Sequence, residues 1–124
     1  MALLYTKEKT GAVYTATLED SDGTAIPLAN ITAITLPLYD VSDGSIINER
    51  EDQNVKNTNN VTIAATSGLL TWNMQADDNP IVDTTLAVGD REHHKALFEF
   101  TYDGNGSPGK HVANISVLNL GKVS

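Results

Sequence analysis

Apolar and polar residues alternate in short stretches along this chain, and a period of two residues indicates β-strands. The alternation begins at residues 13–18, where we expect the first strand, starting near Ala12. Residues 1–12 read instead as an irregular polar lead. We therefore predict an N-terminal lead over residues 1–12 and a single β-domain over residues 13–124.

A second strand is predicted over residues 31–39, where alternate apolar residues share one face: Ile34, Leu36 and Leu38. Pro37 has no N–H to donate to a neighbouring strand, so this strand should lie at a sheet edge or contain a bulge. The turn residues 40–44 then lead into a short strand over residues 45–47. We expect these two strands to form a hairpin.

The segment of residues 48–60 is almost entirely polar and predicts a long surface loop that buries no apolar surface. Loops of this length are uncommon in compact domains unless they have a function or are disordered. Two interpretations stay open, a mobile excursion and a contact with a partner.

Two more strands are predicted over residues 61–64 and 69–74. In the second of these, Leu70, Trp72 and Met74 share a face. Trp72 is therefore the largest candidate for the core, and its alternative role is that of an exposed binding platform.

Residues 76–83 predict one helical turn that connects the two sheets, because Asn79 can cap it and Pro80 suits the first helical position. Asp77 and Asp78 could suggest a paired acid and base. Residues adjacent in sequence need not converge on one substrate, however, and a capping role accounts for both.

The strongest predicted hairpin lies in the second half of the chain. Its first strand, residues 95–102, places four residues on one face: Ala96, Phe98, Phe100 and Tyr102. Its second strand, residues 111–118, returns after a Gly-rich turn at residues 103–109. The chain then has about seven to eight short strands, which predict an antiparallel β-sandwich with one short helical turn.

The composition disfavours several classes of function. The 124 residues carry a formal net charge of -8, which should repel nucleic acids and anionic membranes. Cysteine is absent, which excludes disulfides, thiolate zinc sites and a cysteine nucleophile. The sequence shows neither a signal peptide nor the ~20 consecutive apolar residues of a membrane span, so we expect the protein to be made and kept in a cytoplasm.

Five candidate metal ligands occur in the second half of the chain: Asp90, Glu92, His93, His94 and His111. If Tyr102 pairs near Lys110 in the hairpin, His111 faces about Thr101. His94 then lies seven residues farther along the strand, or roughly 23 Å away at ~3.3 Å per residue. The sequence therefore predicts no shared metal site for these residues.

Motifs for catalysis or cofactor binding are also missing. Residues 20–24 are similar to the first half of a calcium loop, but Ile31 occupies the position that needs a bidentate Glu. Serines lie outside any nucleophile elbow, and no phosphate-binding or dinucleotide-binding glycine loop is present. We expect no catalytic residue, no metal ligand and no cofactor, and hence no enzyme.

Three segments carry a family resemblance: residues 68–74, the acidic turn around Pro80, and residues 96–103. In these segments the chain resembles the Ig-like domains of tailed-bacteriophage virion proteins, and the N-terminal domain of baseplate upper proteins is the nearest named relative. Residues 13–18 and 34–39 also match the opening strands of the family, so the resemblance covers roughly residues 10–120.

The resemblance implies an Ig-like β-sandwich with a structural role in a virus particle. Such domains occur in baseplates, tails, necks and head decorations, and they are not enzymes. Because the chain ends at Ser124 with no following fibre or coiled coil, we expect a small stand-alone accessory protein.

We expect this protein to be assembled into virions in the host cytoplasm and to bind viral structural proteins of the capsid, neck or tail. It should be homo-oligomeric or present in multiple copies, with no nucleic-acid or membrane partner. The alternative is a carbohydrate-binding or cell-surface-binding module in which Trp72 or Tyr102 stacks on a sugar.

Overall fold

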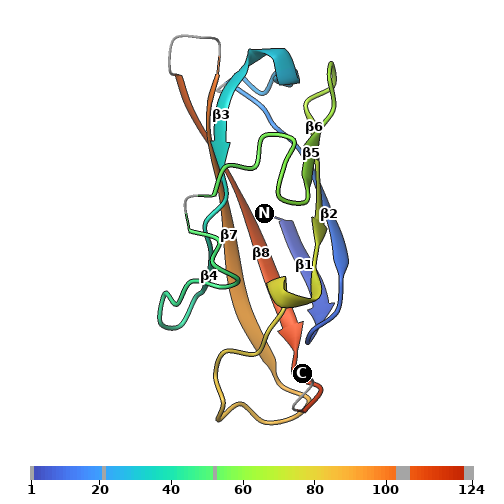
Figure 1. The fold of residues 1–124 in the computed structure, drawn as a ribbon, viewed down its shortest axis with the longest axis vertical. Helices are drawn as coiled ribbons and strands as arrows, with labels where there is room; N and C mark the ends of the chain where they lie inside the picture. The colour runs from blue at the N-terminus through green and yellow to red at the C-terminus, as the bar shows by residue number, and fades with distance from the viewer. Residues whose placement is uncertain (1, 21, 52, 103–106, 122–124) are drawn as a thin grey trace.

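Two β-sheets packed face to face make up the fold in the computed structural model, which describes residues 2–20, 22–51, 53–102 and 107–121 (Figure 1). These residues contain eight strands and two single-turn 3-10 helices, and no helix among them has the length and apolar character needed to cross a membrane. The all-β sandwich predicted from the sequence is therefore confirmed.

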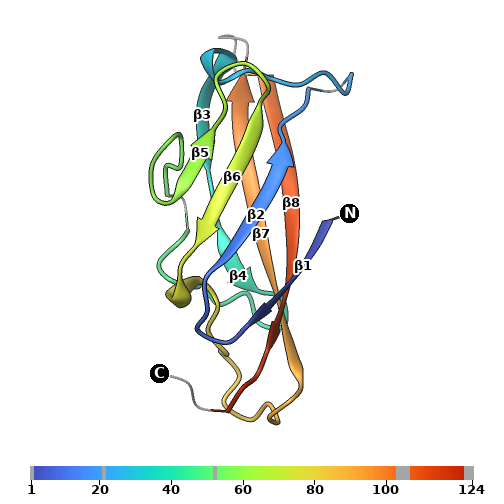
Figure 2. The same ribbon diagram turned by 90° about the vertical axis from the view of Figure 1, so that its right-hand side faces the viewer.

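The strands are divided between a larger and a smaller sheet. The larger sheet contains, in spatial order, β1 (Ala2–Lys7), β8 (Ser107–Leu118) and β7 (Arg91–Tyr102), and then β3 (Ile31–Thr35) and β4 (Leu38–Asp40), which pair with successive parts of β7. The smaller sheet contains β2 (Ala12–Thr17), β6 (Leu69–Met74) and β5 (Val61–Ile63), and Figure 2 shows it in front of the larger one. The 3-10 helices η1 (Leu28–Asn30) and η2 (Ala76–Asp78) lie in the connections. The orders β2-β6-β5 and β8-β7-β3 match those of the immunoglobulin sandwich.

The core lies between the sheets and is built from their inward-facing residues. Because side chains alternate across a strand, alternate residues of β6 and β7 are buried. Trp72 of β6 is completely buried and meets Phe98 of β7 edge to face, with the ring centroids 5.8 Å apart. Strands at residues 69–74 and 95–102 and the core position of Trp72 are thus confirmed.

Residues 2–7, which the sequence suggested were part of an irregular lead, form β1. This strand runs parallel to β8 and pairs with it along its whole length. Its pattern is the reverse of the usual one, because the apolar Leu3 and Tyr5 are exposed while the polar Thr6 is buried. The expectation of irregular structure is therefore wrong for this segment.

The strand predicted over residues 31–39 is divided into β3 and β4 at Leu36 and Pro37. Both parts pair with β7 at the edge of the larger sheet, as expected for a strand that contains proline. Residues 45–47 do not form the predicted strand, but they pair with β4 through an isolated bridge between Ile46 and Tyr39, where the Ile47 N–H donates to the Leu38 carbonyl at 2.9 Å.

The predicted hairpin of the second half is formed by β7 and β8. Tyr102 pairs with Ser107 rather than with a residue near Lys110, so the expected register is wrong. Residues 107–109, which the sequence assigned to the turn, belong to β8. The rest of the predicted turn, residues 103–106, lies outside the described residues.

The loop over residues 48–60 lies along β3 and β4 and buries apolar surface, contrary to expectation. Val55 is completely buried, and its N–H donates to the Ile34 carbonyl at 3.0 Å. Asn57 and Asn59 adopt positive φ angles of 52° and 53°, which asparagine tolerates better than most residues, and so allow tight turns. The loop thus covers the backbone edge of the larger sheet.

The helical turn predicted within residues 76–83 is present as η2, but its caps differ from those expected. Gln75 is the N-cap, and its N–H donates to Asp78 Oδ2 at 2.8 Å. Asn79 follows the turn instead of preceding it, because the turn begins at Ala76 and not at Pro80. The capping role expected of Asp78 is confirmed, and that of Asn79 is wrong.

Candidate functional site

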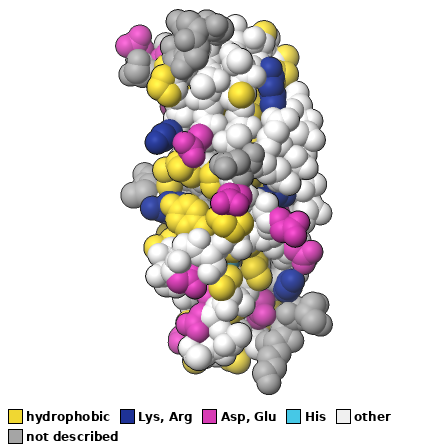
Figure 3. Space-filling view, turned by 60° about the vertical axis from the view of Figure 1, so that its left-hand side comes forward, with side chains coloured by type: hydrophobic (Ala, Val, Ile, Leu, Met, Phe, Trp, Pro, Cys, Tyr) yellow, Lys and Arg dark blue, Asp and Glu magenta, His cyan; other side chains and the backbone are white. Residues whose placement is uncertain are grey.

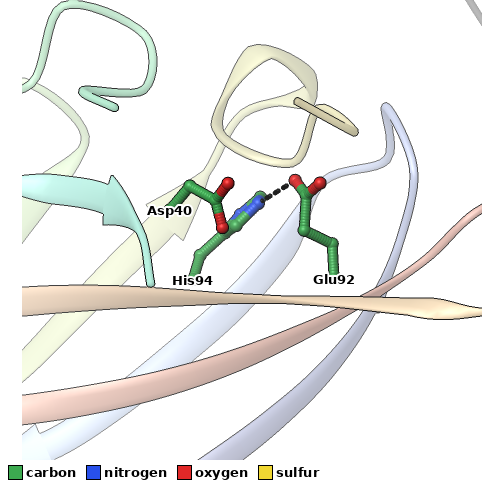
Figure 4. A group of neighbouring side chains, drawn as sticks. All are labelled: Asp40, Glu92 and His94. Atoms are coloured by element: carbon green, nitrogen blue, oxygen red, sulfur yellow. Dashed lines mark hydrogen bonds and ion pairs between the residues drawn. The ribbon is translucent and has the colours of Figure 1, made fainter. Parts of the chain in front are cut away.

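Three buried polar side chains meet on the inner face of the larger sheet, where β4 lies beside β7 (Figure 4): Asp40, Glu92 and His94. Asp40 ends β4 and lies opposite His94 in the ladder. Glu92 precedes His94 by two residues on β7 and therefore faces the same way. One candidate ligand atom of each residue lies within 4.8 Å of the other two. We call these residues the acid–histidine cluster.

Glu92 holds the connection after η2 against the sheet. Its Oε1 accepts a hydrogen bond from the Val82 N–H, and its Oε2 accepts one from the Asp83 N–H, both at 2.8 Å. Its Oε1 also lies 2.6 Å from His94 Nε2. Because an ionised carboxylate can only accept, the imidazole donates this bond through Nε2. His94 Nδ1 has no hydrogen-bond partner among the described residues.

Asp40 directs its carboxylate toward the same space from the other strand (Figure 4). It accepts hydrogen bonds from the Ser42 N–H at 3.3 Å and from Ser42 Oγ at 2.9 Å. These bonds fix the turn that follows β4. They leave part of the acceptor capacity of the carboxylate unused, since a carboxylate offers about four lone-pair sites.

A pocket of about 230 Å³ lies beside the acid–histidine cluster, and its lining includes Asp40, Glu92, Asp83 and Arg91. Hydrogen bonds from Thr85 hold the pKa of Asp83 below its ordinary value, so this exposed carboxylate is ionised at neutral pH. The pocket therefore carries negative charge next to the cluster.

The candidate ligands considered from the sequence are separated by the fold. His93 is exposed on the opposite side of β7, and Asp90 is exposed before that strand begins. His111 lies opposite Phe98 rather than Thr101, and its ring contacts the hydroxyl of Tyr14.

The fold does bring Glu92 and His94 together. The third residue of the cluster, Asp40, was not among the candidates predicted from the sequence. The sequence does contain a signal for Asp40. It follows Ile34, Leu36 and Leu38 at intervals of two residues, so its side chain is expected to face inward as theirs do. Glu92 and His94 likewise continue the inward parity of Ala96 and Phe98.

A second buried polar group joins the loop of residues 48–60 to η2. Arg50 Nε lies 2.6 Å from Asp78 Oδ1, and both side chains are almost completely buried. Asn48 Nδ2 also donates to Asp78 Oδ1, at 2.9 Å, and the Arg50 guanidinium lies 5.7 Å from the Trp72 ring centroid. Asp77 points away and pairs with Lys9 at the surface, so the two adjacent carboxylates do not converge.

The aromatic residues considered as sugar platforms are both buried. Trp72 is completely buried, and Tyr102 is 8% exposed. Neither ring offers the open face that stacking on a sugar requires.

Exposed apolar residues gather on the outward side of the larger sheet, and Figure 3 shows hydrophobic side chains near the middle of this side. Leu3, Tyr5 and Ile46 are 48%, 64% and 41% exposed. Half-buried apolar residues lie among them: Tyr39, Leu97 and Val112. The strand register aligns Leu3, Asn114, Lys95, Tyr39 and Ile46 in one row across the sheet. We call this surface the outer face.

Basic residues accompany the apolar ones on the outer face. Six lysines and arginines in the described part of the chain are not buried, and four of them face outward here: Lys7, Arg91, Lys95 and Lys110. The Arg91 guanidinium lies 5.0 Å from the ring centroid of Tyr5, and its Nη1 donates to the Ser116 carbonyl at 3.1 Å. Four basic residues thus face outward on the strands of this sheet, together with Glu99, which lies opposite Lys110 in the β7–β8 ladder.

Comparison with protein-family models, with curated proteins and with solved structures gave no match.

Proposed function

We propose that this protein is a non-enzymatic structural protein of a tailed-bacteriophage particle, either a capsid decoration or a neck or tail component. It docks on the viral scaffold through the outer face of the larger sheet. The assignment to a virion comes from the family resemblance described above, and the docking surface comes from the fold.

The outer face is the observation that carries this proposal. Soluble proteins expose single apolar side chains routinely, but a contiguous apolar patch rimmed by polar residues is typical of an interaction site. Here Tyr39 and Ile46 are paired at one edge of the sheet, Leu97 and Val112 are paired at its centre, and Leu3 and Tyr5 project from the edge strand β1. A partner that covered this surface would remove several apolar side chains from water at once.

The charge of the outer face indicates the chemistry of the partner. The chain as a whole has a net charge of -8, yet the outer face carries Lys7, Arg91, Lys95 and Lys110. Complementary charges favour encounter and fix register in protein interfaces. The partner is therefore a viral structural protein whose docking surface combines apolar and acidic residues.

Incorporation into particles tests this proposal. Tyr5→Glu and Lys95→Glu change the outer face, and Val13→Glu is a matched control because Val13 is 58% exposed on β2 of the smaller sheet. Particles assembled with each variant would be purified, and the copy number of the protein would be measured by quantitative mass spectrometry. We expect wild type and Val13→Glu at equal copy number and both outer-face variants at least tenfold lower.

Two results would count against the proposal. Absence of the wild-type protein from particles would remove the virion role. Equal incorporation of all four proteins, with thermal unfolding showing each of them folded, would move the docking surface away from the outer face.

A further inference from the structure

The acid–histidine cluster brings two carboxylates into the interior without a lysine or arginine of the described residues to balance them. Asp40 and Glu92 are 2% and 6% exposed, and neither forms an ion pair with a lysine or arginine of the described residues. Burying an ionised carboxylate is costly unless a cation or several hydrogen bonds compensate. His94, if protonated, would balance one of the two charges and would then leave its Nδ1–H without an acceptor.

Unused acceptor capacity converges on the same space. Glu92 accepts three hydrogen bonds, Asp40 accepts two from Ser42, and each has room for at least one more. His94 is 1% exposed, and its Nδ1 has no partner among the described residues. The imidazole and the Glu92 carboxylate are joined by the proton between His94 Nε2 and Glu92 Oε1, and a divalent cation that replaced this proton would be held by both residues and by Asp40.

We propose that Asp40, Glu92 and His94 form a binding site for a divalent metal ion, with zinc as the preferred class. Zinc binds both imidazole nitrogen and carboxylate oxygen, whereas magnesium and calcium prefer oxygen ligands alone. The pocket beside the cluster provides a path for the ion and space for a water as the fourth ligand.

The geometry requires a small adjustment. Ligand atoms ~2.0–2.2 Å from a tetrahedral zinc ion lie about 3.3–3.6 Å apart. The candidate atoms lie within 4.8 Å of one another. His94 Nε2 and Glu92 Oε1 are 2.6 Å apart because a proton lies between them, and once zinc replaced that proton the two atoms would separate by about 0.7–1 Å. The widest separation therefore closes by about an ångström, which side-chain rotation can supply. Asp40 and His94 are fixed partners in the β4–β7 ladder, so the backbone already holds them in place.

The ion would join three segments at one end of the sandwich. Asp40 anchors the turn after β4, His94 belongs to β7, and Glu92 holds the connection after η2 through Val82 and Asp83. The site thus has a structural role that is separate from docking through the outer face.

Zinc binding by the whole protein tests the inference. Protein freed of metal by a chelator would be titrated with ZnCl2 by calorimetry, and Tm would be measured with and without zinc. We expect one equivalent to bind and to raise Tm. Asp40→Asn and His94→Gln should each weaken binding at least tenfold and abolish the rise in Tm. The matched controls are Asp43→Asn and His93→Gln, which change exposed neighbours and should retain both effects.

A second measurement does not depend on the folding of the variants. Long-range 1H–15N spectra of the wild-type imidazoles should show one nitrogen of His94 shifting on addition of one equivalent of zinc, with His111 unchanged. Failure to bind one equivalent would overturn the proposal. So would binding that survives Asp40→Asn and His94→Gln, or that is lost with His93→Gln, because the ion would then sit on the surface.

Discussion

Arg50 and Asp78 form an ion pair inside the protein, with Arg50 Nε 2.6 Å from Asp78 Oδ1. The pair connects the polar loop of residues 48–60 to η2, and Gln53 and Asn60 complete the hydrogen bonding of the guanidinium. Both charges are compensated by neighbours, so removing one of them leaves the other buried and unpaired.

The first prediction concerns this pair. Arg50→Met should lower the free energy of unfolding by about 3–5 kcal/mol, because Asp78 would lose its cation in the interior. The double variant with Asp78→Leu should lose less than the sum of the single variants. Lys9→Met is the control, since its pair with Asp77 is exposed and contributes at most about 1 kcal/mol. Urea unfolding of wild type and the four variants measures these losses, and strictly additive losses would show that the two residues are not coupled.

The second prediction concerns Gly68, which directly precedes β6. Gly68 has a φ of +69°, and a Cβ there would lie 2.5 Å from the Ile26 carbonyl oxygen. Gly68→Ala should therefore cost more than the roughly 1–2 kcal/mol of a left-handed alanine.

Gly44 provides the comparison, because its φ of +76° is similar but nothing lies within 4 Å of its Cβ position. Gly44→Ala should lower the free energy of unfolding only by the cost of holding alanine in the left-handed conformation. Equal losses of unfolding free energy for both variants in urea titrations would mean that residues 26 and 68 are not in close contact.

Trp72 gives a direct optical test of the core. The chain contains one tryptophan, and it is completely buried. The native protein should therefore emit at short wavelength, resist quenching by acrylamide and shift to longer wavelength on unfolding. An easily quenched native emission would instead place Trp72 at the surface and restore the sugar-platform interpretation.

The partial burial of His111 and Tyr14 predicts a dependence of stability on pH. Burial lowers the pKa of His111 below its ordinary 6.5 and raises the pKa of Tyr14 above its ordinary 10.0. As the pH falls through 6.5, the unfolded chain takes up a proton at His111 before the folded protein does, so stability is lost. At alkaline pH the unfolded chain loses the Tyr14 proton first, and stability is lost again above about 10.

His111→Gln tests the acidic side of this dependence. Chemical unfolding between pH 8 and pH 5 should show the stability of wild type falling relative to the variant below pH 6.5. Parallel curves for the two proteins across this range would show that His111 titrates alike in the folded and unfolded states.

Alternation of large apolar residues made much of the fold predictable. Residues 69–74 and 95–102 each present one bulky face to the core, and such segments have a single favourable orientation. The prediction for residues 2–7 was wrong because Leu3 and Tyr5 point outward while Leu4 packs against the core, so these apolar residues do not alternate with polar ones. The prediction for the loop of residues 48–60 was wrong because its packing depends on the ion pair between Arg50 and Asp78, a contact that composition does not reveal.

The candidate site could be predicted only in part, because it depends on which strands pair and in what register. The expected register placed His111 near Thr101, whereas it lies opposite Phe98. His93 and His94 are adjacent in sequence but lie on opposite sides of β7. Asp40 joins the cluster through strand pairing, which a single sequence specifies weakly.

The parallel pairing of β1 with β8 has a consequence for synthesis of the protein. The ribosome makes β1 first and β8 about 100 residues later, so β1 has no partner strand while the intervening chain is translated. Until β8 emerges, Leu4 lacks its place against the core, and the backbone of β1 is open to other strands. Closure of this edge is therefore a late step of folding, and the nascent chain is most prone to aggregation just before it.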